Sequence, residues 1–74
     1  MQYLIFRSVS DNHVFVVCHD GEFYSPPEAV RRRGPWQGMH RDDIAKLNLH
    51  YWLDLEEQGY SLVRRERAVF RPED

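Results

Sequence analysis

Two short hydrophobic runs near the start of the chain are separated by turn-forming residues. They are YLIFRSV at 3–9 and HVFVVCH at 13–19, and both are rich in the β-branched and aromatic residues that favour strands. The intervening SDN at 10–12 favours a turn because these short polar side chains bond the nearby backbone. Hydrophobic residues fall on both alternating faces of each run, which indicates a sheet with one face covered and the other partly covered. The pattern predicts a β-hairpin over about residues 2–19.

The segment SPPEAVRRRGP at 25–35 carries the start and stop signals of one short helix. Ser25 suits the N-cap, a proline follows at the first helical position, and Glu28 completes a capping box. The three arginines at 31–33 complement the helix dipole in the last turn, and a Gly-Pro pair then stops the helix. We expect a capped helix over about residues 26–33.

A longer stretch over about residues 41–58 has helical periodicity, with Asp42 and Asp43 suited to its start and Gly59 to its end. Its hydrophobic residues form two adjoining stripes, a wide arc for one helix on a small sheet. The first stripe contains Ile44, Leu47, Tyr51 and Leu55, and the second contains Ala45, Leu49, Trp52 and Leu53. Asn48 is a good N-cap residue. The stretch is therefore predicted as one helix or, slightly favoured, as two pieces with a break at Asn48.

The tail over about residues 60–71 is hydrophobic near both ends, with the charged RRER at 64–67 between them. It is predicted as one long edge strand or as a hairpin that turns at the charges, and the lack of Gly and Asn there weakens the hairpin. The resulting order, β-β-α-α-β, predicts an α+β fold. We expect one domain over residues 1–74, with an antiparallel sheet and the helices packed on one face.

Composition adds limits to this picture. A chain of 74 residues that is 42% hydrophobic forms one small domain, and such a domain is marginally stable without a disulfide, a metal or a partner. No hydrophobic run is long enough to span a membrane. A single cysteine excludes an internal disulfide, and the hydrophobic run at 3–6 is too short for a signal peptide. These features predict a cytoplasmic protein.

Charge is unevenly distributed along the chain, although the net charge is only −2. Acidic residues predominate in residues 1–24 and 42–58, whereas arginines predominate in 25–41 and 59–74. The alternation predicts a fold with one basic and one acidic face. The negative total argues against a general binder of polyanions.

The titratable residues do not form a recognisable catalytic or metal-binding pattern. Cys18 and His19 are adjacent, so in a strand they point to opposite faces, and no zinc-ligand spacing occurs. Cys18 lies among hydrophobic residues, where a thiol is inert, and no serine lies in a nucleophile elbow. We expect no enzyme activity, no catalytic residues, no metal and no cofactor.

Arginines are the candidate contacts for an anion or a nucleic acid, because the planar guanidinium bonds phosphates and carboxylates in pairs. The ordinary alternative is structural. Glu28 and Arg32 are spaced to pair on a helix, and arginines on an edge strand prevent strand addition. The candidate set contains Arg31, Arg32, Arg33, Arg41, Arg64, Arg65 and Arg67.

Large hydrophobic residues are the candidate contacts for a protein partner or a second copy of the chain. Trp36 lies in the loop GPWQG at 34–38, where it could anchor a partner or fold back between helix and sheet. The second helical piece has more hydrophobic surface than one small sheet needs, so it could form an interface unless a broken helix buries both stripes. The candidate set contains Trp36, Leu49, Tyr51, Trp52 and Leu53.

The leading hypothesis from the sequence is a non-enzymatic protein-interaction or regulatory module that forms a homodimer. The alternative is a nucleic-acid-binding regulator that uses the arginine clusters. A third hypothesis is a small-molecule sensor with Trp36 over a pocket.

Overall fold

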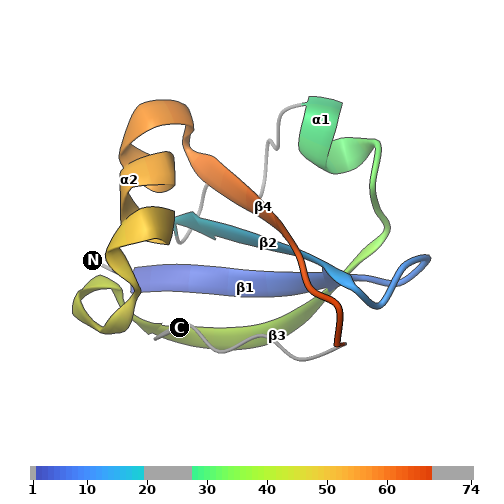
Figure 1. Ribbon diagram of the computed structural model, residues 1–74, viewed down its shortest axis with the longest axis horizontal. Helices are drawn as coiled ribbons and strands as arrows, with labels where there is room; N and C mark the ends of the chain where they lie inside the picture. The colour runs from blue at the N-terminus through green and yellow to red at the C-terminus, as the bar shows by residue number, and fades with distance from the viewer. Residues whose placement is uncertain (1, 20–27, 68–74) are drawn as a thin grey trace.

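A four-stranded antiparallel sheet organises the computed structural model, which describes residues 2–19 and 28–67 (Figure 1). The strands lie in the order β3-β1-β2-β4. The elements are β1 (Gln2–Ser8), β2 (Val14–His19), α1 (Glu28–Arg31), β3 (Trp36–Asp43), the 3₁₀ helix η2 (Ile44–Lys46), α2 (Leu49–Gln58) and β4 (Tyr60–Arg64). The expected α+β class and antiparallel sheet are confirmed, and the described helices are all too short to cross a membrane.

β1 and β2 pair as a hairpin, with Ile5 opposite Val17. The Asp11 carboxylate accepts a hydrogen bond of 3.0 Å from the backbone N–H of His13, and the Asp11 carbonyl accepts one of 3.1 Å from Val14 N–H. These bonds reverse the chain direction within the turn. The polar residues 10–12 therefore form the predicted turn.

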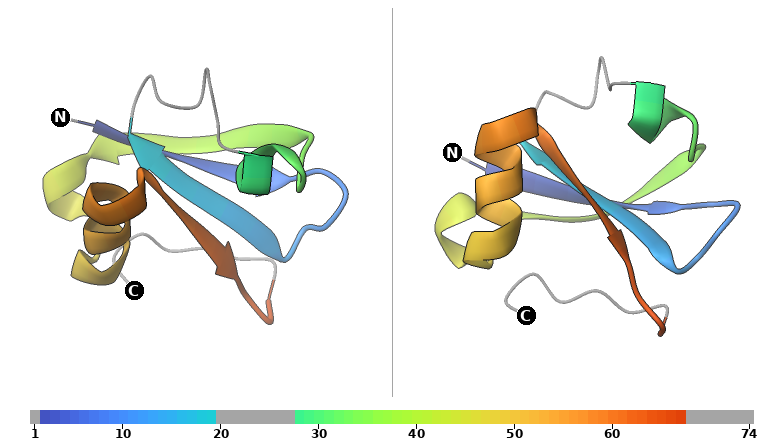
Figure 2. Two further views of the ribbon diagram at one scale, coloured as in Figure 1. Left: turned by 90° about the horizontal axis from the view of Figure 1, so that it is seen from above. Right: turned by 45° about the horizontal axis from the view of Figure 1, so that its top comes forward.

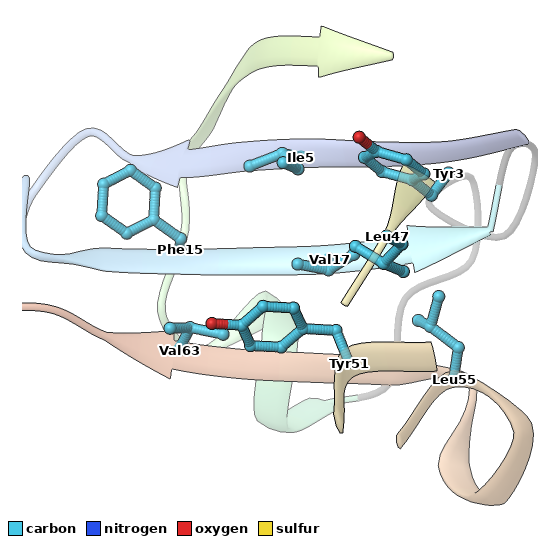
Figure 3. Packing of buried hydrophobic residues seen from close by; sticks show 8 residues of the cluster. All are labelled: Tyr3, Ile5, Phe15, Val17, Leu47, Tyr51, Leu55 and Val63. Atoms are coloured by element: carbon cyan, nitrogen blue, oxygen red, sulfur yellow. The ribbon is translucent and has the colours of Figure 1, made fainter. Parts of the chain in front are cut away.

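One face of the sheet carries the main hydrophobic cluster, and α2 covers it (Figure 3). The odd-numbered side chains of β1 and β2 point to this face, as alternation in a strand requires. The cluster consists of Tyr3, Ile5, Phe15, Val17, Leu47, Tyr51, Leu55 and Val63. α2 stands toward the end of the sheet at which β1 begins, whereas α1 lies toward the other end (Figures 1 and 2).

The short helix α1 lies against the opposite face of the sheet, so the expectation that both helices share one face needs correction. Ser8, an even-numbered residue of β1, donates a hydrogen bond of 2.8 Å from its hydroxyl to the carbonyl of Arg33 just after α1. Val30 is the buried residue of α1. The physical reason is that β2 has buried hydrophobic side chains on both faces, so each face needs a cover.

Residues 36–43 form strand β3, and this differs from the expected loop and helix start. β3 pairs antiparallel with β1 and becomes an edge strand, which changes the order of elements to β-β-α-β-α-β. Met39 has no partner in β1, because Ile5 pairs with His40 and Phe6 with Gly38. Backbone pairing holds this strand, whose side chains are mostly exposed.

The helical stretch expected over 41–58 is interrupted at Asn48. This agrees with the slightly favoured prediction of two pieces rather than one helix. The Asn48 side chain accepts a hydrogen bond of 2.9 Å from the backbone N–H of His50 and so caps α2. Upstream, Asp43 caps η2 by accepting from the N–H of Ala45. Gly59 ends α2 in a left-handed conformation, φ 86°.

The tail begins with β4, which pairs antiparallel with β2. The choice between one strand and a hairpin over 60–71 depends on residues from 68 onward, which lie outside the described residues. The same holds for the predicted Ser25 cap and the first turn of the helix over 26–33, of which α1 is the described part.

Candidate interaction surfaces

α2 presents hydrophobic side chains on the side that faces away from the sheet. Leu49, Trp52 and Leu53 are 61%, 36% and 50% exposed. Their spacing of three and four residues places them next to one another on a helix. We call these three residues the outer α2 patch. The sequence named all three as candidate partner contacts.

Two other candidate partner residues pack inside the protein. Tyr51 is 9% exposed, belongs to the main cluster, and its hydroxyl accepts a hydrogen bond from the Arg65 guanidinium. Trp36 is half-buried, and its indole N–H donates a hydrogen bond of 2.9 Å to the carbonyl of Val30. Trp36 therefore folds back against α1, which is the alternative that the sequence left open. Neither side chain lines the outer α2 patch.

Acidic side chains lie next to the outer α2 patch in the second half of α2. Glu56 and Glu57 are exposed near the end of α2, and Asp54 is half-buried where it accepts a bond of 2.8 Å from the Ser61 hydroxyl. At the other end of the helix, Lys46 lies 3.6 Å from the Asp42 carboxylate and is balanced by it. The patch is therefore bordered by negative charge toward the end of α2.

One arginine from each of the two clusters lies at the end of the sheet that holds the β1–β2 turn. Arg33 and Arg64 line one hollow of about 200 Å³, with Val14 and Leu62 also lining it. Arg31, the last residue of α1, and Arg32, in the turn that follows, are exposed beside Arg33, and Arg32 pairs with Glu28 at 3.4 Å. The fold thus joins arginines that are about thirty residues apart in sequence.

The remaining candidate arginines do not join this hollow. Arg65 turns to the α2 side, where its guanidinium lies 5.8 Å from the centre of the Tyr51 ring. Arg67 is exposed beyond β4. Arg41 lies on β3 opposite Leu4, toward the start of β1, so it is separated along the strands from Arg33 and Arg64. The predicted set of seven arginines is therefore not one continuous patch.

Two carboxylates have pKa values below the ordinary value. The pKa of Asp11 is lowered chiefly by the hydrogen bond from the His13 backbone N–H and also by the Arg64 guanidinium 3.1 Å away. The pKa of Asp42 is lowered by a bond from the Asp43 backbone N–H and by Lys46 and His40. Both groups hold local structure together at the surface.

A second apolar surface lies on the β1–β3 part of the sheet, and the sequence did not predict it. An open groove of about 520 Å³ is lined by residues 4–6 of β1 and residues 38–41 of β3. It exists because β3 pairs with β1, so it cannot be predicted from a sequence pattern that places residues 34–38 in a loop. Cys18 is buried and does not line the groove. Among residues 2–19 and 28–67 no three metal-ligating side chains lie together.

Comparison of the chain with protein-family models, curated proteins and solved structures finds no match.

Proposed function

We propose that the protein is a non-enzymatic interaction module that forms a homodimer through the outer α2 patch. The observation that carries the proposal is the exposure of Leu49, Trp52 and Leu53 on a helix whose inner side is already buried. Contiguous exposed hydrophobic side chains commonly mark interfaces, and a two-fold contact would use each of these side chains twice. Tryptophan at the centre of such a contact is a frequent hot spot.

The size and charge of the patch set the expected strength of the dimer. A helix of ten residues is about 15 Å long, so a contact between two copies of α2 falls at or below the standard interface size of about 1,200–2,000 Å². We therefore expect a dissociation constant in the micromolar range. Glu56 and Glu57 of the two copies would repel each other, so added salt should strengthen the dimer.

Sedimentation velocity over about 1–500 μM protein tests the proposal. Leu53→Glu should shift the protein to monomer, because it adds a charge at the centre of the contact and keeps a helix-forming residue. The matched control is Val9→Glu: Val9 is 61% exposed, as Leu49 is, but lies at the β1–β2 turn. A strict monomer at the highest concentration, or equal loss of the dimer in both variants, would contradict the proposal.

A nucleic-acid-binding function is the second candidate, and one observation favours it. Arg33 and Arg64 line the same hollow, so the fold brings two arginine clusters to one end of the sheet. Guanidinium groups there could contact successive phosphates. Against it stands the ion pair that Arg64 already makes with Asp11.

Titration of fluorescent single- and double-stranded oligonucleotides at low salt tests this candidate. Affinity should fall linearly with salt on logarithmic scales, and Arg33→Gln with Arg64→Gln should reduce the slope by about two. Arg41→Gln, which lies elsewhere on the sheet, should leave the slope unchanged. Added salt should strengthen the dimer and weaken nucleic-acid binding, so the salt dependence distinguishes the two functions. No binding at low salt would exclude the nucleic-acid function.

A further inference from the structure

Leu53 marks the centre of the exposed side of α2. The buried residues of this helix are Tyr51 and Leu55, which point into the main cluster (Figure 3). Successive residues of an α-helix are rotated by about 100°, so Leu53 lies opposite the midpoint between these two residues. A second copy of α2 that packs on the outer α2 patch would therefore meet Leu53 at the middle of the contact. A two-fold axis there would bring the two copies of Leu53 together.

Charged and titratable residues lie on the flanks of Leu53 in a definite order. His50 and Glu57, both exposed, share one flank, because a separation of seven residues is almost two full turns. His50 precedes Leu53 by about 4.5 Å along the helix axis, and Glu57 follows it by about 6 Å. The other flank carries Leu49 and Glu56, with the glutamate again toward the end of the helix.

The direction of the partner helix decides which charges meet. In an antiparallel two-fold contact centred on Leu53, each flank meets the same flank of the partner in the reverse order. His50 then comes level with the partner's Glu57 to within about 1.5 Å along the axis. In a parallel two-fold contact each flank meets the opposite flank at the same height, so Glu57 meets the partner's Glu56. Carboxylates placed together repel, and the charges therefore favour the antiparallel contact.

Within a single chain, a protonated His50 has little compensating negative charge. It lies in the first turn of α2, where the helix dipole favours anions over cations. Asp54, one turn further along α2, is half-buried and already accepts a hydrogen bond from β4. The preceding 3₁₀ helix contributes the ion pair of Lys46 with Asp42, whose charges balance. The partner's Glu57 would supply the negative charge that an imidazolium at His50 needs.

We propose that the homodimer is antiparallel across α2 and that protonation of His50 tightens it through an ion pair with the partner's Glu57. This inference rests on the proposed homodimer and adds its geometry and its regulation. The histidine side chain ordinarily changes charge between pH 5 and pH 8, so mild acidification is the signal. The two-fold axis makes two such exposed pairs, which together should tighten the dimer about two- to thirtyfold.

Sedimentation velocity of the full chain at pH 7.5 and pH 5.5 measures this change in the dissociation constant. The net charge, −2 with neutral histidines, also becomes less negative as the pH falls, so the control must change charge equally. Glu57→Gln should abolish most of the tightening. Glu56→Gln, which removes the same charge at the neighbouring exposed position, should keep it. Glutamine is a good helix former, so both variants should fold as the parent does.

Two substitutions of His50 test the other side of the pair. His50→Gln should remove most of the pH response. His50→Lys, which is charged at both pH values, should dimerise at pH 7.5 as tightly as the parent does at pH 5.5. Addition of Glu57→Gln to His50→Lys should cancel this gain, whereas addition of Glu56→Gln should not. Salt should strengthen the parent dimer less at pH 5.5 than at pH 7.5, because it then also screens two attractive pairs.

Two outcomes would overturn the antiparallel pairing. They are equal pH responses of Glu56→Gln and Glu57→Gln, and a pH response of His50→Gln as large as that of the parent. In either case, a dimer that Leu53→Glu abolishes would leave the homodimer itself in place. A strict monomer at both pH values would contradict both proposals, so the two failures are distinguishable.

Discussion

The hydroxyl of Ser61 on β4 donates a hydrogen bond of 2.8 Å to the carboxylate of Asp54 on α2. Ser61 is buried, and the bond links the helix to the edge strand that follows it. Tyr51 and Leu55 hold the inner side of α2 against the sheet, while this bond fixes its flank. The orientation that leaves Leu53 exposed is therefore set by contacts on two sides of the helix.

Removal of the Ser61–Asp54 bond should destabilise the protein measurably. Ser61→Ala leaves a half-buried carboxylate without its donor, so we expect the free energy of unfolding to fall by about 1–2 kcal/mol. A double-mutant cycle with Asp54→Ala in urea denaturation isolates the pair. A coupling energy below about 0.3 kcal/mol would show that the bond adds nothing to stability.

The start of α2 depends on the Asn48 side chain, which accepts from the N–H of His50. Asn48→Ala should lower the free energy of unfolding by about 1 kcal/mol, whereas Asn48→Asp should preserve it, because aspartate caps helices equally well. Urea denaturation followed by circular dichroism measures both. Equal losses in the two variants would mean that another property of Asn48 matters.

Substitution of two glycines by alanine should change the stability of the protein in opposite directions. Gly59 has φ 86°, a conformation that costs about 1 kcal/mol for residues with a Cβ atom, so Gly59→Ala should destabilise by about that amount. Gly38 lies in a strand, with room for a Cβ near Phe6, so Gly38→Ala should be neutral or stabilising. Thermal and urea midpoints check the pair. Similar effects at both sites would contradict the backbone argument.

Acid should destabilise the fold through Asp11 and Asp42. Their folded pKa values lie below the ordinary value of 3.8, so the unfolded state binds more protons as the pH falls. The stability that they contribute is complete above the unfolded pKa, at about pH 5 and higher, and it is lost as the pH falls through the folded values. Urea midpoints between pH 7 and pH 2 should show this loss.

The double variant Asp11→Asn and Asp42→Asn isolates these two carboxylates. It should lose less stability than the parent protein between pH 5 and pH 2. An identical acid loss in the double variant would assign the pH dependence to other groups.

The sequence alone allowed prediction of the elements whose structure is determined by their own side chains. Two runs of β-branched and aromatic residues and the SDN turn define the hairpin of β1 and β2, and Asn48 and Gly59 define the ends of α2. In each case the signal is local, because a cap or a turn is made by residues within a few positions of one another.

β3 could not be predicted in the same way. Its sequence WQGMHRDD lacks alternation, since an edge strand with mostly exposed side chains needs none. Its stability comes from backbone bonds to β1, whose paired residues lie 28 to 41 positions earlier in the sequence. Asp43 looked like a helix start and does cap η2, but the helix beyond it lasts three residues.

The candidate surfaces were predictable to the extent that they lie on one element. The outer α2 patch follows from helical spacing, whereas the grouping of Arg33 with Arg64 and the separation of Arg41 depend on strand order. Tyr51 and Trp36 show that residue type alone does not identify an interface residue. Both are large aromatic residues typical of interfaces, and both satisfy their polar atoms inside the protein.

The unpaired Met39 has a consequence for how copies of this chain meet. It interrupts the register of β3, and the residues that follow, His40 to Asp43, carry charge or polarity along that border of the sheet. The opposite border, β4, is five residues long and runs into arginines. A growing fibril needs a long, regular border on which to add chains. Both borders are poor templates for such growth, so the protein should not form fibrils even at the micromolar concentrations at which we propose that the outer α2 patch forms a dimer.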